Sequence, residues 1–133
     1  MKKEMVYTSF CLKKPIVIAK GKYRGLRYFV LNLGTHPCAY VDVAKTKLRG
    51  IDYGDLKIDI DCHGGITYSD KNLLSVKKEG WYIGWDYAHG GDFCGCFLGT
   101  DSYYTLKMWS TKEMIAECKK VIDQIKSEVQ GDE

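Results

Sequence analysis

The sequence lacks both a long apolar run and a secretory signal. None of its segments approaches the roughly 18 uninterrupted apolar residues that a membrane span requires. Near the N-terminus, Lys13 and Lys14 interrupt the apolar residues before these could form the hydrophobic region of a signal peptide. We therefore expect a cytoplasmic protein with no membrane partner.

Positive charge is not concentrated in any part of the chain. The 20 lysines and arginines exceed the 17 aspartates and glutamates by three, and the lysines are spread along the sequence. Proteins that bind nucleic-acid polymers usually gather basic residues in one run or on one face. The charge pattern therefore argues against a nucleic-acid polymer as the partner.

The cysteines lack the regular spacing of a disulfide framework. There are six in 133 residues, and no secretory signal places them in an oxidising compartment. We expect all six to be reduced thiols: Cys11, Cys38, Cys62, Cys94, Cys96 and Cys118.

Length and composition predict one globular domain. The chain is 45% hydrophobic and 28% charged, which is close to the average for soluble domains. It contains no internal repeat and no low-complexity segment. We expect a single domain over residues 1–133, in which the tail, residues 130–133, is frayed.

Short apolar or alternating segments separated by turn residues predict a mainly antiparallel sheet. The pair "LRYFVLNL" and "CAYVDV", joined by "GTHP", is typical of two antiparallel strands. "LKIDID" alternates apolar and charged residues, as a strand with one wet face does. The predicted strands are residues 5–12, 15–21, 26–33, 38–43, 56–61, 81–85 and 103–109.

The C-terminus predicts an amphipathic helix over about residues 110–129. Ser110 and Glu113 match a capping box, in which each side chain accepts a hydrogen bond from the other residue's backbone N–H. The apolar stripe must cover one face of the sheet, which predicts an α+β fold. The stripe consists of Met114, Ile115, Cys118, Val121, Ile122, Ile125 and Val129.

Two segments combine titratable side chains with a glycine pair. "DCHGGITYS" contains Asp61 and His63, and "WDYAHGGD" contains two carboxylates and His89. Glycine pairs allow sharp turns and a close approach of a ligand to the backbone, so a shared site is one interpretation. The candidate ligand-binding residues are His63, Gly64, Gly65, Thr67, Ser69, Trp85, Asp86, His89 and Asp92.

Other interpretations of these residues remain open. The glycine pairs could be simple turns, with the aspartates bonded to their own backbone as Asx turns. His63, Asp86, His89 and Asp92 also offer the nitrogen and oxygen ligands that zinc, manganese or iron accept. A second metal hypothesis uses Cys62, Cys94 and Cys96 with His63, although structural zinc usually prefers Cys-x-x-Cys spacing.

Catalytic and stacking roles are two further hypotheses. A nucleophile such as Thr67, Ser69 or a cysteine could pair with His63 or His89, but no signature of a triad is present. Aromatic residues near the polar segments would suit a pocket that stacks a flat ring. These residues are Tyr40, Tyr53, Tyr68, Trp81, Tyr82, Trp85, Tyr87 and Phe93.

The segments "THPCAYVDV", "CHGGITYS" and "GWYIGWDYAHGGDF", followed by a terminal amphipathic helix, resemble a family of short uncharacterised bacteriophage and prophage proteins. The resemblance covers residues 30–128 and departs from the family pattern at Trp85, where Phe is usual, and at Tyr87, where Cys is common. It implies a viral or prophage origin and activity in the host-cell cytosol. It marks His36, Pro37, His63, Gly64, Gly65, Thr67, Ser69, Trp85, Asp86, His89, Gly91 and Asp92.

Three functional hypotheses follow. The first is a phage accessory protein that binds and sequesters a small polar host molecule, such as a nucleotide-type immune signal. The second is a metal-dependent hydrolase of phosphoester or nucleotide substrates, with Asp or His as general base. The third is a protein inhibitor that binds a host defence enzyme. Neither a cofactor nor an oligomeric state follows from the residues.

Overall fold

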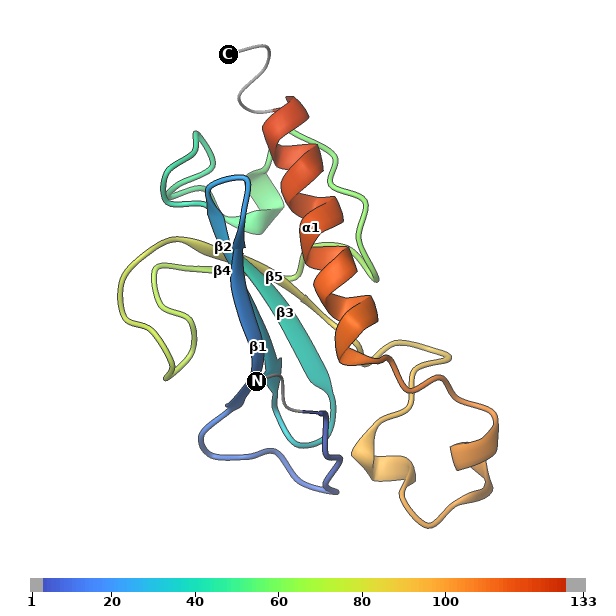
Figure 1. Ribbon diagram of the computed structural model, residues 1–133. Coiled ribbons are helices and arrows are strands. Elements are labelled where there is room, and N and C mark those ends of the chain that lie inside the picture. Colours follow the sequence, from blue (N-terminus) through green and yellow to red (C-terminus); the bar gives the residue numbers. More distant parts are fainter. Residues whose placement is uncertain (1–3, 129–133) are drawn as a thin grey trace.

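The fold is an antiparallel sheet with one long helix on one of its faces (Figure 1). The computed structural model describes residues 4–128, without the side chains of residues 103 and 104. The five strands lie in the order β1-β2-β3-β5-β4, and each neighbouring pair is antiparallel. This arrangement confirms the predicted α+β class. The elements are β1 (Ile16–Tyr23), β2 (Leu26–Asn32), β3 (Pro37–Asp42), β4 (Tyr68–Asp70), β5 (Tyr82–Asp86) and α1 (Thr111–Glu128), with short 3-10 helices at Tyr53–Asp55, Gly95–Phe97 and Asp101–Tyr104.

Local turn chemistry accounts for the first three strands. Arg24 and Gly25 join β1 to β2 with φ angles of 49° and 87°, the two left-handed residues of a tight hairpin turn. The predicted pairing of the next two strands is confirmed, with Asn32 opposite Pro37 at the turn. Gly34 in this turn has φ 98°, and its N–H donates to the Asn32 side chain.

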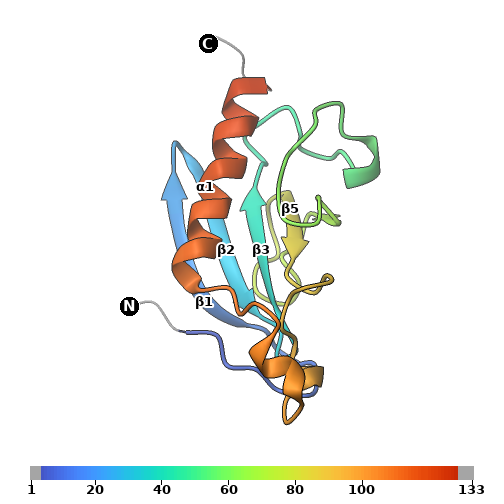
Figure 2. The same ribbon diagram turned by 90° about the vertical axis from the view of Figure 1, so that its right-hand side faces the viewer.

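Helix α1 covers one face of the sheet through the predicted apolar stripe. It packs against β1, β2 and β3 (Figure 2). The capping box is present, since the Ser110 N–H donates to Glu113 Oε1 at 2.9 Å and the Glu113 N–H donates to Ser110 Oγ at 3.1 Å. Val129 and the tail lie outside the described residues. Buried helix residues of the stripe are Met114, Ile115, Cys118, Val121, Ile122 and Ile125.

The opposite face of the sheet carries a second, smaller core. Leu73, Leu74 and Val76, from the loop between β4 and β5, pack against it. Figure 1 shows this loop on the other side of the sheet from α1. Because both faces are covered, β2 and β3 are buried along almost their whole length. The buried residues of this core are Phe29, Leu31, Cys38, Tyr40, Leu73 and Tyr82.

Two of the predicted strands lack the partner that a strand needs. Residues 5–12 form no strand and bend at residues 9 and 10. Two of their N–H groups, those of Thr8 and Leu12, donate to the hairpin at Gly34 and Leu33. Residues 56–61 also form no strand. Leu56, Ile58 and Ile60 still belong to or contact the larger core, which lies between α1 and the sheet. The alternation therefore reflects burial of one side of the segment without a neighbouring strand.

The prediction of a strand at residues 103–109 is also wrong. The segment begins inside the 3-10 helix Asp101–Tyr104, and within residues 4–128 its only ladder contact is an isolated bridge between Lys107 and Asp92. This bridge nevertheless matters for the site, because it holds the segment that leads into α1 beside the loop after β5. None of the helices in the described part of the chain has the length and apolar character to cross a membrane.

Candidate ligand-binding site

The candidate site lies at the end of β5, where successive side chains of the chain point to opposite faces of the sheet. Trp85 and Tyr87 pack in the core under α1, whereas Asp86 lines a cavity on the opposite face, which Trp85 also borders. The chain then passes through the loop at residues 87–94, whose polar residues meet the turn at residues 61–65. The two polar segments singled out in the sequence are thereby brought together.

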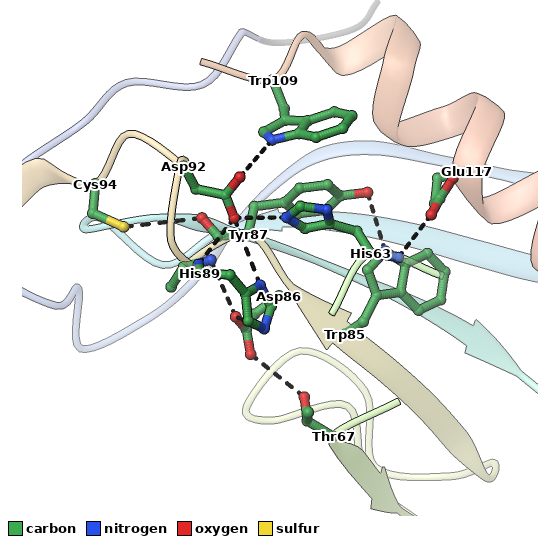
Figure 3. A network of polar contacts seen from close by, with 11 residues as sticks. His63, Thr67, Trp85, Asp86, Tyr87, His89, Asp92, Cys94, Trp109 and Glu117 are labelled. Atoms are coloured by element: carbon green, nitrogen blue, oxygen red, sulfur yellow. Dashed lines mark hydrogen bonds and ion pairs between the residues drawn. The ribbon is translucent and has the colours of Figure 1, made fainter. Parts of the chain in front are cut away.

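Asp92 is the centre of the hydrogen bonding in this region (Figure 3). Its carboxylate is buried and accepts from Trp109 Nε1 at 2.8 Å and from the backbone N–H of His89 at 3.0 Å. His63 Nε2 lies 2.7 Å from Asp92 Oδ2. One carboxylate therefore joins the turn before β4, the loop after β5 and the residue that precedes the N-cap of α1.

These hydrogen bonds determine the ionisation of Asp92. Burial by itself would raise the pKa of the Asp92 carboxyl group, but the bonds from His63, His89 and Trp109 outweigh burial and lower this pKa below its ordinary value. The carboxylate is ionised at neutral pH and can only accept hydrogen bonds. His63 Nε2 therefore carries the proton in this contact.

The His63 ring is fixed by aromatic neighbours and by its backbone. It stacks on Tyr87, with ring centroids 5.0 Å apart and planes inclined by 11°, and it lies 4.8 Å from the Trp109 ring. The backbone N–H of His63 donates to Glu117 Oε2 of α1 at 2.8 Å. A ring held from three sides loses little conformational entropy when it binds a ligand.

His89 lies between two carboxylates without a hydrogen bond from its ring to either of them. Its Nε2 is 3.6 Å from Asp86 Oδ1, and its Nδ1 is 3.6 Å from Asp92 Oδ2. Among the described residues, His89 Nδ1 is a buried side-chain nitrogen that has no hydrogen-bond partner. The ring packs directly over Gly64, where a β-carbon would collide with it. We call His63, Asp86, His89 and Asp92 the polar cluster.

A cavity of about 260 Å³ adjoins the polar cluster on the face opposite α1. Asp86 belongs to both, because it lines the cavity and also faces His89. Thr67 Oγ1 donates to Asp86 Oδ2 at 3.4 Å from the other side. The lining residues are Leu33, His36, Cys38, Tyr40, Thr67, Tyr68, Leu74, Trp85 and Asp86.

His36 contributes the third imidazole of this region and lies in the turn between β2 and β3. Its Nδ1 is hydrogen-bonded to Thr35 Oγ1 at 2.8 Å. Burial lowers the pKa of His36, and nearby His89 lowers it further, against the opposing effect of Asp86. His36 is therefore neutral at pH 7 and offers a polar but uncharged group to the cavity.

Some of the predicted site residues lie apart from this arrangement. Ser69 Oγ accepts from the backbone N–H of Tyr53, and Ser69 does not line the cavity. Gly65 has φ 82° and continues the turn that begins at Gly64. Among the described residues, the one group with metal-ligating atoms within 4.8 Å of one another is His63, His89 and Asp92, and it contains no cysteine. All six cysteines are free thiols.

Two residues of the site were not identified in the sequence. Trp109 supplies a hydrogen bond to Asp92 and one wall of the His63 ring, and Glu117 holds the His63 backbone. The position of Trp109 directly before the capping box was a usable signal, since the residue preceding a helix is fixed in direction by the cap. Nothing in the sequence distinguishes Glu117 from the other charged residues of the helix.

Comparisons with protein-family models, with curated proteins and with solved structures find no match for this chain. Its function has to be argued from the chemistry of the site. That chemistry consists of two carboxylates, three imidazoles and a threonine hydroxyl, next to an aromatic cavity. The arrangement can accept hydrogen bonds from a polar ligand, and its histidines and Asp92 can bind a metal ion.

Proposed function

We propose that the protein binds a small polar molecule of the nucleotide type and sequesters it without chemical change. The observation that carries the proposal is the continuity between the cavity and the polar cluster through Asp86. Binding sites for small molecules commonly combine apolar and aromatic walls with a few convergent polar groups. Here the walls are aromatic and aliphatic, and His36, Thr67 and Asp86 supply the polar groups.

The size of the cavity limits what can enter it. Ligand pockets usually measure about 300–1,000 Å³, and this cavity, at about 260 Å³, lies just below that range. It suits one ring system or one sugar, and the remainder of a larger ligand would extend over the polar cluster or into solvent. The rings of Tyr40 and Tyr68, 5.2 Å apart in an edge-to-face pair, form the aromatic part of the wall.

The charge of the site decides the orientation of such a ligand. Asp86 is a carboxylate at the cavity, so it favours hydrogen-bond donors such as the amino group of a base or the hydroxyl groups of a ribose. A phosphate group placed directly against Asp86 would be repelled. In the proposed complex the base or ribose therefore occupies the cavity and the phosphates lie away from Asp86.

The biological setting is part of the same proposal. The three linked motifs that resemble bacteriophage proteins support an accessory protein that acts in the host cytosol against a nucleotide-type immune signal. Rigid placement of the polar groups supports binding, because a preorganised site loses little entropy when the ligand arrives. A host molecule held in this way is withdrawn from its receptor by mass action.

A thermal-shift screen tests the proposal. The panel contains adenosine, AMP, ADP-ribose, cyclic mononucleotides and cyclic dinucleotides, each added to the full chain. A ligand that binds only the folded state raises the free energy of unfolding by about 2.7 kcal/mol at a hundredfold excess over its dissociation constant. Absence of any stabilising nucleotide in the panel would count against the proposal.

The chemical fate of a stabilising nucleotide separates sequestration from hydrolysis. The complex is incubated, the protein is denatured, and the released nucleotide is analysed by chromatography and mass spectrometry. Sequestration predicts recovery of the intact ligand in a stoichiometric amount. Hydrolysis products that accumulate beyond one equivalent would replace the proposal with the hydrolase hypothesis.

A further inference from the structure

We infer that His63 Nε2, His89 Nδ1 and Asp92 Oδ2 form a binding site for one divalent metal ion, with zinc as the best match to the donor set. The inference does not depend on the proposed nucleotide binding, and either can fail alone. Two imidazole nitrogens and one carboxylate oxygen are a common protein ligand set for zinc. They come from two segments that are almost 30 residues apart in the sequence.

The spacing of the three atoms suits a tetrahedral ion. Zinc lies about 2.0–2.2 Å from its nitrogen and oxygen ligands, which places two tetrahedral ligands about 3.3–3.5 Å apart. The three candidate atoms all lie within 4.8 Å of one another, and His89 Nδ1 is 3.6 Å from Asp92 Oδ2. His63 Nε2 is closer, at 2.7 Å, because a proton lies between it and Asp92. Metal binding at Nε2 would move that proton to Nδ1 of the same ring through exchange with solvent, and would lengthen the contact slightly.

The unpartnered nitrogen of His89 is an independent observation. A buried polar atom without a hydrogen bond costs about 1–3 kcal/mol of stability, so such atoms are rare in folded proteins. His89 Nδ1 has this cost although an ionised carboxylate lies 3.6 Å away. A metal ion bound between the two atoms would give the nitrogen a ligand bond and would neutralise the carboxylate.

The surrounding contacts match those that support metal ligands in other proteins. A ligating histidine commonly directs its second ring nitrogen at a carboxylate, and a ligating carboxylate is itself hydrogen-bonded. His89 Nε2 faces Asp86 Oδ1 at 3.6 Å, and Asp92 Oδ1 accepts from Trp109 Nε1 at 2.8 Å. Asp92 Oδ2 faces the rings of both histidines and also accepts from the His89 backbone N–H at 3.0 Å, so this hydrogen bond would orient it as a metal ligand.

Three protein ligands leave at least one coordination position open. In zinc proteins such a position is taken by water or by an oxygen of the ligand. The ion would add two positive charges beside Asp86 and Asp92, so the site could then accept an anionic group that the carboxylates alone would repel. Metal loading would therefore determine whether the site accepts an anionic ligand.

A titration of the metal-free full chain tests this inference. The purified protein is treated with a chelator and dialysed, and Zn²⁺ or Co²⁺ is then added, with calorimetry for stoichiometry and visible absorption for the Co²⁺ geometry. We expect one equivalent to bind, a rise in melting temperature, and the absorption bands of tetrahedral Co²⁺ without thiolate charge transfer. His89→Ala should weaken binding more than about 100-fold, since even outer contacts of metal ligands are worth 10–100-fold.

His36→Ala is the matched control, because it removes a neighbouring imidazole that is not among the three ligands. It should bind Zn²⁺ like the parent, and circular dichroism should show that both variants are folded. If His89→Ala does not fold, Asp92→Asn and His63→Gln provide the same comparison. Absence of binding by the parent, equal binding by His89→Ala, or a thiolate signal from Co²⁺ would each overturn the inference.

Discussion

Asp92 holds the polar cluster together because one buried carboxylate serves three donors. Removal of the carboxylate in Asp92→Ala leaves Trp109 Nε1, His63 Nε2 and the His89 N–H without their acceptor. Each orphaned buried donor costs about 1–3 kcal/mol. Asp92 therefore has a structural role in addition to any role in binding. Asp86 is about 30% exposed, and its Oδ1 accepts from the backbone N–H of Ala88 at 3.1 Å, as in an Asx turn.

We predict that the contribution of Asp92 to stability depends on pH. The lowered pKa of Asp92 means that its stabilising effect is fully present above the pKa of the unfolded chain, near 3.9, and is lost as the pH falls through the folded-state pKa. Asp92→Asn should therefore be less stable than the parent at pH 7, and the difference should shrink below about pH 4. Urea unfolding of both proteins at several pH values measures this.

Asp59→Asn is the control for that experiment, since Asp59 is exposed. Its unfolding free energy should follow the parent at every pH. A difference between Asp92→Asn and the parent that is constant from neutral to acidic pH would contradict the predicted ionisation of the buried carboxylate.

Gly64 and Gly65 provide a second prediction at the residue scale. Both have left-handed φ angles, 73° and 82°, so alanine at either position costs about 1–2 kcal/mol of backbone strain. A β-carbon at Gly64 would collide with the His89 ring, whereas a β-carbon at Gly65 would meet no atom within 4 Å. We predict that Gly64→Ala displaces His89 and loses binding of Zn²⁺, while Gly65→Ala is destabilised but still binds.

Melting curves and Zn²⁺ titrations of the two alanine variants measure these effects separately. The comparison is informative because the backbone strain is shared and only the contact with His89 differs. Equal Zn²⁺ affinity in both variants would show that the position of the His89 ring is not needed for the metal.

At the scale of elements, α1 positions the site from one side. The helix begins one residue after Ser110, Trp109 precedes the cap and bonds to Asp92, and Glu117 holds the turn at His63. The capping box therefore determines both the start of the helix and the place of the indole. Its loss should affect the site as well as the stability of the helix.

We predict that Ser110→Ala lowers the free energy of unfolding by about 1 kcal/mol, within the 0.5–2 kcal/mol typical of N-cap residues. Ser127→Ala is the control, because Ser127 is an exposed serine of the same helix and alanine is the better helix former. Chemical denaturation of both variants gives the values. A Ser110→Ala variant as stable as Ser127→Ala would contradict the role of the cap.

At the scale of the whole molecule, the sequence predicted the sheet and the covering helix better than it predicted the individual strands. Alternation and apolar runs identified β2, β3 and β5, because these strands are buried and paired, and they also identified the partly exposed edge strand β1. The same patterns failed at residues 5–12, at residues 56–61, where one side of the chain is buried but no strand lies alongside, and at residues 103–109, which begin in a 3-10 helix. Hydrophobic periodicity indicates which side of a segment is buried, whereas tertiary structure determines whether the segment pairs with another strand.

The polar residues of the site were predictable for the same reason, and their partners were not. His63 and His89 were marked by glycine pairs at strand ends, and the structure brings them to within 5.1 Å between ring centroids. Glu117 reaches the site from the helix, and no local pattern distinguishes it from the other charged residues there. The division of the site between the polar cluster and the adjoining cavity also depends on which face of the sheet each β5 side chain occupies.

Isothermal titration of the panel nucleotides into the parent, His89→Ala, Asp86→Asn and Asp59→Asn tests most directly whether the cavity and the polar cluster form one ligand site. We predict that a nucleotide which stabilises the parent binds equally well to Asp59→Asn and does not bind to Asp86→Asn or His89→Ala. The two site variants should keep the stability of the parent or exceed it, since polar groups kept for function often reduce stability. Destabilised Asp86→Asn and His89→Ala variants that still bind the nucleotide like the parent would contradict the account.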